Sequence, residues 1–185
     1  MSVGRFAARV LIGGLFIGHG TQKLKGWFGG SGLEGTDGMM QSLNMHPVRR
    51  NSIASGVTET AGGTMLVMGL ATPLASAGLI GVMLTAIRKV HLANGPWAAN
   101  GGWEYNAVLI AALVALAEEG PGEVSLDRLL GQDRSGVAWG LGALALGAAA
   151  STAAIEAGRR SAQDAAADDG SSPYPETAGD PVTSA

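Results

Sequence analysis

Two ionisable residues, Glu59 and His19, lie where proton chemistry is favoured. Glu59 is six residues inside the apolar run 53–70, about 9 Å below its start at the helical rise of about 1.5 Å per residue. An ionisable group that deep is costly unless it is paired, so we expect Glu59 to face the interior of a helix bundle and to have a partner. His19 lies near the end of another apolar run, and imidazole can exchange protons near neutral pH. Glu59 and His19 are therefore the predicted catalytic candidates.

Further polar side chains lie at the ends of apolar runs, where they could line a shared pocket. In the stretch GLFIGHGTQKLKGWFGG, residues 14–30, His19 and Lys23 are four residues apart and share one face of a helix. Arg88 and His91 are three residues apart and are neighbours in the same way. The predicted ligand-binding residues are Gln22, Lys23, Arg88, His91, Glu104 and Asn106.

Each of these residues also has a purely structural interpretation. Lys23, Arg88 and Lys89 lie near helix ends, where long cationic side chains often extend to the membrane surface. His19 and His91 could only bridge helices through hydrogen bonds, which is the commoner role of a lone histidine in a membrane. A metal held by two histidines and a carboxylate is less favoured, and no metal site is predicted.

The elements that must position these residues are apolar blocks. The blocks cover residues 3–24, 53–70, 74–92, 105–116 and 136–155, and nearly all of the charge lies outside them. A bilayer core requires a helix of about 20 residues. The pattern predicts an all-α, polytopic membrane four-helix bundle with an additional C-terminal transmembrane helix. A soluble helical bundle is the alternative, but blocks of this length without a charged outer face are hard to solvate.

The connections between the blocks predict which ends meet. Only residues 71–73 join the second and third blocks, whereas the other connections are longer. If each block crosses the membrane once, all the predicted site residues lie at one face of the membrane. Lys23 and Arg88 are then expected to offer cations from two helices to the carboxylate of Glu59.

Basic residues outside the helix cores favour one orientation. Eight lie at the polar face and four at the opposite face, where Arg5 and Arg9 are interpreted as interface anchors or orientation signals. The positive-inside rule then places the polar face in the cytoplasm. Without Lys23, Arg88 and Lys89 the count is five against four, so the orientation stays open.

The absence of cysteine excludes several kinds of redox centre. The chain cannot exchange a dithiol with a disulfide, hold an iron–sulfur cluster through thiolates or carry a covalent c-type haem. Any redox chemistry must belong to a bound small molecule or a partner. A net charge of -3 and the lack of a basic stripe interleaved with aromatics give no sign of nucleic-acid binding.

The connecting segments give weaker signals. Residues 29–38 are rich in glycine and are expected to form a loop, and residues 39–50 a short amphipathic helix stopped by Pro47. Residues from about 162 onward have too few apolar side chains to order and are expected to be disordered. The predicted units are a membrane domain at 1–131, an additional helix at 132–160 and a disordered polar tail at 161–185.

Four segments resemble the DoxX family of bacterial integral membrane proteins. They are GHGTQKLKGWFGGSGLEG at the end of the first block, TETAGGTMLVMGLATPLA in the second hairpin, GGWEYNAVLIAALVALA in the fourth block and GPGEVSLDRLLG at 120–131. The resemblance covers about residues 3–131 and implies a four-helix core in the bacterial inner membrane, which is the cytoplasmic membrane. The family is related to the DoxD subunit of thiosulfate:quinone oxidoreductase, and some members are described as membrane components of an oxidoreductase assembly.

This resemblance implies a quinone- or small-molecule-binding component of a membrane oxidoreductase system linked to thiosulfate or oxidative stress. A quinone is the cofactor that it suggests, and the bilayer and membrane or peripheral redox proteins are the partners. The alternative is a noncatalytic membrane scaffold or small-molecule carrier, and both enzymatic activity and oligomeric state stay open. The recurrent polar positions of the family correspond to His19, Gln22, Lys23, Glu59, Glu104 and Asn106.

Overall fold

The computed structural model describes residues 2–168, and every regular element in that range is helical. The predicted all-α class is confirmed. The α-helices are α1 (Val3–Lys25), α2 (Gly32–Ser42), α3 (Val48–Met68), α4 (Thr72–Ala86), α5 (Glu104–Glu119), α6 (Leu126–Leu129) and α7 (Val137–Asp168). Short 3₁₀ turns cover Trp27–Gly29, Leu92–Asn94 and Ala98–Asn100, and a π-helical turn continues α4 over Ile87–His91.

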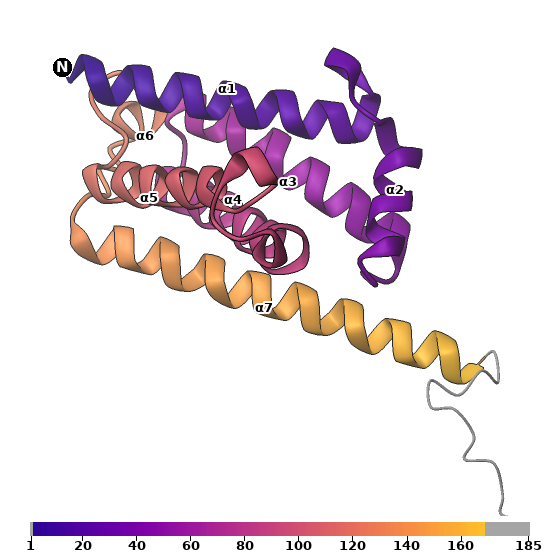
Figure 1. Cartoon of the computed structure of the whole chain (residues 1–185). Coiled ribbons are helices and arrows are strands. Elements are labelled where there is room, and N and C mark those ends of the chain that lie inside the picture. The colour runs from indigo at the N-terminus through magenta and orange to yellow at the C-terminus, as the bar shows by residue number, and fades with distance from the viewer. Residues whose placement is uncertain (1, 169–185) are drawn as a thin grey trace, which may run out of the picture.

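The long helices form a bundle in which sequence neighbours pack in antiparallel pairs. Figure 1 shows α1 along one side of the bundle, α3, α4 and α5 within it, and α7 along the opposite side. The most extensive helix contacts join α1 to α3 and α4 to α7. The additional helix therefore packs directly on the core instead of standing apart from it.

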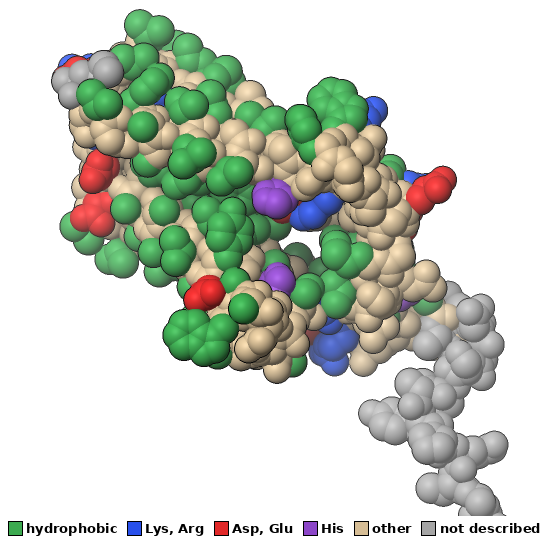
Figure 2. Space-filling view, turned by 45° about the horizontal axis from the view of Figure 1, so that its top comes forward, with side chains coloured by type: hydrophobic (Ala, Val, Ile, Leu, Met, Phe, Trp, Pro, Cys, Tyr) green, Lys and Arg blue, Asp and Glu red, His purple; other side chains and the backbone are tan. Residues whose placement is uncertain are grey.

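The interior is apolar, and so is much of the outer surface. Phe16, Leu66 and Leu113 are buried in the core of the bundle. Leu11 and Val108, in contrast, are 65% and 66% exposed, and Figure 2 shows hydrophobic side chains over much of the visible surface. An outer surface of this kind is typical of helices that face lipid.

Two helical segments are long and apolar enough to cross a membrane by length and composition, Thr72–Asn94 and Val137–Ala165. Both correspond to predicted blocks. Helix α5, with 16 residues, is shorter than a full bilayer crossing requires.

The segment between α1 and α3 has a different secondary structure from the predicted one. Residues 32–42, mostly expected as loop, form α2, and the predicted helix at 39–50 is wrong in position. The hydroxyl of Thr36, which is buried, donates to the carbonyls of Gly32 at 2.7 Å and of Lys23 at 3.2 Å. This contact docks α2 onto the end of α1, and tertiary packing overrides the low helix propensity of its glycines.

The start of α3 and the end of α7 also differ from the predicted helix boundaries. Pro47 does not stop a helix but precedes α3 as its N-cap residue, where its fixed φ suits a helix start. Helix α7 continues to Asp168, so the expected disorder is wrong for residues 161–168. The rest of the predicted tail, residues 169–185, lies outside the described residues.

Candidate functional site

The centre of the candidate site is an ion pair between α1 and α3. The ammonium of Lys23 lies 2.6 Å from Oε1 of Glu59 and donates to the hydroxyl of Ser55 at 3.1 Å. The side chain of Glu59 is 2% exposed and that of Lys23 is 24% exposed. Glu59 therefore has the buried position and the cationic partner that its place in the sequence predicts.

Small residues let the two helices approach closely enough for this pair. A β-carbon on Gly20 would lie 2.6 Å from the carbonyl oxygen of Gly56, closer than such contacts allow. Gly20 precedes Lys23 by three residues, and Gly56 precedes Glu59 by three residues, so the close approach lies about one turn from the pair on each helix. Packing of the backbones thus fixes the distance that Lys23 must span.

The second carboxylate oxygen of Glu59 is the unusual atom of the site. Oε2 is buried and has no hydrogen-bond partner among the described residues. A buried acceptor without a donor is costly, so it is the natural place for a hydroxyl or amine of a bound molecule. Lys23 forms the exposed side of the pair, so an entering molecule would meet its ammonium first.

His19, one turn before Lys23, and Gln22, directly before it, form a second polar group. Nδ1 of His19 lies 3.1 Å from Oε1 of Gln22, whose Nε2 donates to the carbonyl of Phe28 at 3.4 Å. Since the amide nitrogen donates to Phe28, its oxygen is left to accept from His19, which assigns the imidazole proton to Nδ1. Nε2 of His19 is then the nitrogen that can accept a proton.

His91 and Glu104 lie at the same end but bind the connection between α4 and α5. Nδ1 of His91 donates to the carbonyl of Gly101 at 2.7 Å. The carboxylate of Glu104 accepts from the backbone amide of Ala98, also at 2.7 Å. Both side chains therefore order the loop, and neither is bonded to the Lys23–Glu59 pair.

Arg88 and Asn106 bind partners other than Glu59. The guanidinium of Arg88 donates to the hydroxyl of Thr152 on α7 at 3.0 Å, so the expected second cation beside Glu59 is wrong. Asn106 is buried and donates to the sulfur of Met83 at 3.4 Å. The structure thus brings Lys23 to Glu59 and His19 to Gln22, while the other four predicted residues have separate partners.

Figure 2 shows how histidine and cationic side chains gather on the surface. Histidine side chains lie at the margins of a hollow, with lysine or arginine side chains nearby, in a surface that is otherwise largely apolar or uncharged. Among residues 2–168, no group of three or more His, Cys, Asp or Glu is placed to hold a metal ion. The side chains at the margins of the hollow therefore offer imidazole and positive charge.

The family model of DoxX matches residues 4–92. The chain belongs to the DoxX family. The matched segment runs from α1 through the π-helical turn and includes Lys23, Glu59 and His91, whereas Glu104 and Asn106 lie beyond it. No curated protein and no solved structure matches the chain.

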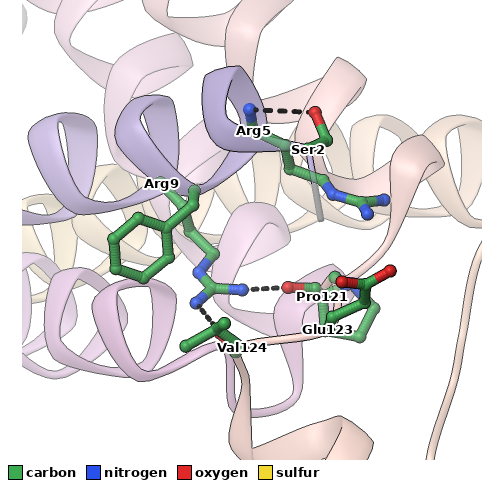
Figure 3. A pocket seen from close by; sticks show the side chains of 8 residues that line it. Ser2, Arg5, Arg9, Pro121, Glu123 and Val124 are labelled. Atoms are coloured by element: carbon green, nitrogen blue, oxygen red, sulfur yellow. Dashed lines mark hydrogen bonds between the residues drawn. The ribbon is translucent and has the colours of Figure 1, made fainter.

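At the opposite end of this DoxX-family bundle, Arg9 forms a cluster that the sequence pattern does not predict. Arg9 is only 2% exposed, so its interpretation as an interface anchor is wrong. Its guanidinium donates to the carbonyls of Pro121, of Val124 at 2.6 Å and of Val67 at 3.4 Å. Figure 3 shows it pointing into the loop that carries Pro121 and Val124.

The short helix α6 completes this cluster. The carboxylate of Asp127 is fully buried and accepts from the backbone amides of Ala71 at 2.7 Å and Thr72 at 3.1 Å, and from the Thr72 hydroxyl at 3.3 Å. The cavity beside Arg9 has a volume of only about 10 Å³, about the space of one water. We therefore assign this end a structural role; the signal for it was the segment GPGEVSLDRLLG, in which polar residues follow an apolar block.

Proposed function

We propose that this chain is a multi-pass protein of the bacterial cytoplasmic membrane that binds a quinone between α1 and α3 as part of a membrane oxidoreductase system. The observation that carries the proposal is Glu59, whose Oε1 is held by Lys23 while its buried Oε2 has no partner in the described chain. A carboxylate left in this state is suited to a ligand that brings a hydrogen-bond donor.

Exposed apolar side chains support the multi-pass placement. Besides the two segments that are apolar enough to cross a membrane, α1 exposes Leu11 and Leu15, and α3 exposes Ile53 and Val57. In water these side chains would form apolar strips that monomeric proteins seldom display. A bilayer around all the long helices would cover them.

The proposed chemistry divides between the chain and the ligand. A bound quinone supplies the two-electron chemistry that a chain without cysteine lacks. The ammonium of Lys23 can donate to a carbonyl or anionic oxygen, and Oε2 of Glu59 can accept from a hydroxyl. Nε2 of His19, at the exposed side, can take up a proton. Thiosulfate or a redox partner is the electron donor that the family resemblance suggests.

The alternative function, a noncatalytic scaffold or small-molecule carrier, is favoured by a different observation. His91, Glu104 and Arg88 have hydrogen-bond partners within the chain and so are accounted for without a ligand. In this alternative, the Lys23–Glu59 pair binds a molecule without catalysing a reaction, or it only stabilises the packing of α1 on α3.

A binding and turnover assay on the full chain in detergent tests the proposal. The extract should contain quinone, a short-chain quinone should bind saturably, and thiosulfate should reduce it in the presence of the chain. We expect Glu59→Gln and Lys23→Gln to weaken quinone binding by at least about tenfold, since each loses a charge-assisted hydrogen bond. Glu34→Gln is the matched control, because Glu34 is exposed on α2 and has no partner in the described chain.

The outcomes separate the two functions. Saturable binding that depends on Glu59, with no turnover on thiosulfate or another donor, supports the carrier. Absence of quinone from the extract together with no saturable binding overturns the proposed site. Thermal unfolding of each variant must accompany the assay, so that a lost fold is not read as a lost ligand.

A further inference from the structure

An open apolar groove lies along the outward face of the first turns of α3. Ile53 and Val57, one turn apart, are 42% and 48% exposed and form its floor with Ala54. Arg49 and Arg50 lie at the start of the groove, next to Val48, where α3 begins. The groove is lined by Pro47, Arg49, Arg50, Ile53, Ala54 and Val57.

The two arginines differ in what they bind. Arg49 is paired with Asp37 of α2, with 3.2 Å between Nε and the carboxylate oxygen. Arg50 is exposed and has no hydrogen-bond or ion-pair partner among residues 2–168. The groove therefore carries one uncompensated positive charge at one end of a strip that is otherwise apolar.

The positions along α3 match the depth profile of a phospholipid. Arg50 precedes Glu59 by nine residues, which places it about 13 Å nearer the helix start. Ile53 and Val57 lie about 4 Å and about 10 Å deeper than Arg50. A charge at the surface with apolar side chains directly below it suits an anionic headgroup joined to an acyl chain.

The short length of the apolar strip favours a lipid over a protein. Only Ile53, Ala54 and Val57 form its apolar floor, little more than one helical turn. A partner helix or a second copy of this chain would require a longer apolar stripe for ridges to pack into grooves. Part of one acyl chain can pack on a strip of this length.

We propose that this groove binds one anionic phospholipid, with its phosphate at Arg50 and an acyl chain along Ile53 and Val57. The proposal depends on the membrane placement given above but not on the chemistry of the Lys23–Glu59 site. The groove and that site can therefore fail independently.

Native mass spectrometry of the full chain in detergent tests the proposal. The chain is titrated with phosphatidylglycerol or with phosphatidylcholine of the same acyl chains. We expect one phosphatidylglycerol to bind about fivefold more tightly than phosphatidylcholine, and Arg50→Gln to abolish that preference. Val57→Trp, which fills the groove at an exposed position, should weaken binding of both lipids.

Lys25→Gln is the matched control. Lys25 is an exposed cation at the same end of the bundle, with no partner in the described chain, and it lies off the groove. Its removal should leave the preference unchanged, and glycerol 3-phosphate, a headgroup without chains, should not compete. Equal binding of the two lipids, an equal effect of Lys25→Gln and Arg50→Gln, competition by glycerol 3-phosphate, or a dimer that Val57→Trp disrupts would each overturn the proposal.

Discussion

Gly13 of α1 and Gly63 of α3 bring the two helix backbones into direct contact. A β-carbon on Gly13 would lie 2.6 Å from the carbonyl oxygen of Gly63, and one on Gly63 would lie 2.5 Å from the carbonyl oxygen of Gly13. Close approach through small residues is how helices pack where lipid offers no hydrophobic driving force. A second close approach of the same two helices, between Gly20 and Gly56, lies next to the Lys23–Glu59 pair.

Gly13→Ala should therefore push α1 away from α3. We expect a loss of about 1–3 kcal/mol in the free energy of unfolding, the usual cost of overpacking, measured by denaturation of the chain in detergent. Gly14→Ala is the control, since a β-carbon there meets nothing within 4 Å. It should be neutral or stabilising by up to about 1 kcal/mol because alanine favours the helix. Equal losses in both variants would contradict the close crossing.

Asp127 caps the start of α4 from a distant part of the chain. Asp127→Ala leaves the backbone amides of Ala71 and Thr72 without their buried acceptor. We expect a loss of about 3 kcal/mol in the free energy of unfolding, as befits hydrogen bonds to a charged group. Asp133→Asn should cost less than about 1 kcal/mol, since among residues 2–168 Asp133 forms only an exposed pair with Arg128. Similar costs for the two would show that the cap is not important.

Arg9 holds the loop after α5 through the fork geometry of its guanidinium. Lysine keeps the charge of Arg9 but cannot bind several carbonyls in this way, so Arg9→Lys should destabilise the protein by about 2 kcal/mol. It should also speed protease cleavage near Val124. Arg5→Lys is the control, because Arg5 makes one carbonyl bond, to Glu119 at 2.7 Å, and one bond is easier to replace. Cleavage at the same rate in both variants would contradict the role of Arg9.

The sequence predicts the long helices well because each lies in an apolar block bounded by charge or glycine. It also predicts that Glu59 has a cationic partner, since the alternation of chain direction places the end of α1 beside the start of α3. The direction of a helix predicts how far along the bundle a residue lies, but it does not predict which neighbouring helix its side chain faces. The sequence therefore predicts the correct end of the bundle for Arg88 but the wrong partner.

The structure shows why the helix face of Arg88 differs from the predicted one. Arg88 lies in the π-helical turn Ile87–His91, whose wider winding shifts the faces of the residues that follow and cannot be read from apolar spacing. The burial of Arg9 escapes prediction from the sequence for a related reason. Its burial depends on carbonyls more than 50 residues away in sequence, which local pattern does not reveal.

A double-mutant cycle can measure how far the Lys23–Glu59 pair stabilises the fold. Lys23→Met leaves a buried carboxylate without its cation, and we expect it to cost about 2 kcal/mol, less than a fully buried pair because Lys23 is partly exposed. Glu59→Leu in the same chain removes the orphaned charge, so the double variant should be more stable than Lys23→Met alone. Additive losses would show that the two side chains do not interact.

The orientation of the bundle can be measured with single cysteines, since the chain has none of its own. Asn100 lies at the polar end and Gln132 at the opposite end, both exposed and separated by α5. If the excess of basic residues at the polar end acts as a topology signal, Asn100→Cys faces the cytoplasm. An impermeant maleimide should then label Gln132→Cys in intact cells, and Asn100→Cys only after the membrane is opened. The reverse pattern would contradict the orientation but keep the membrane crossing by α5. Labelling of both from the same side would contradict the crossing itself, and with it the shared membrane face on which the site prediction depends.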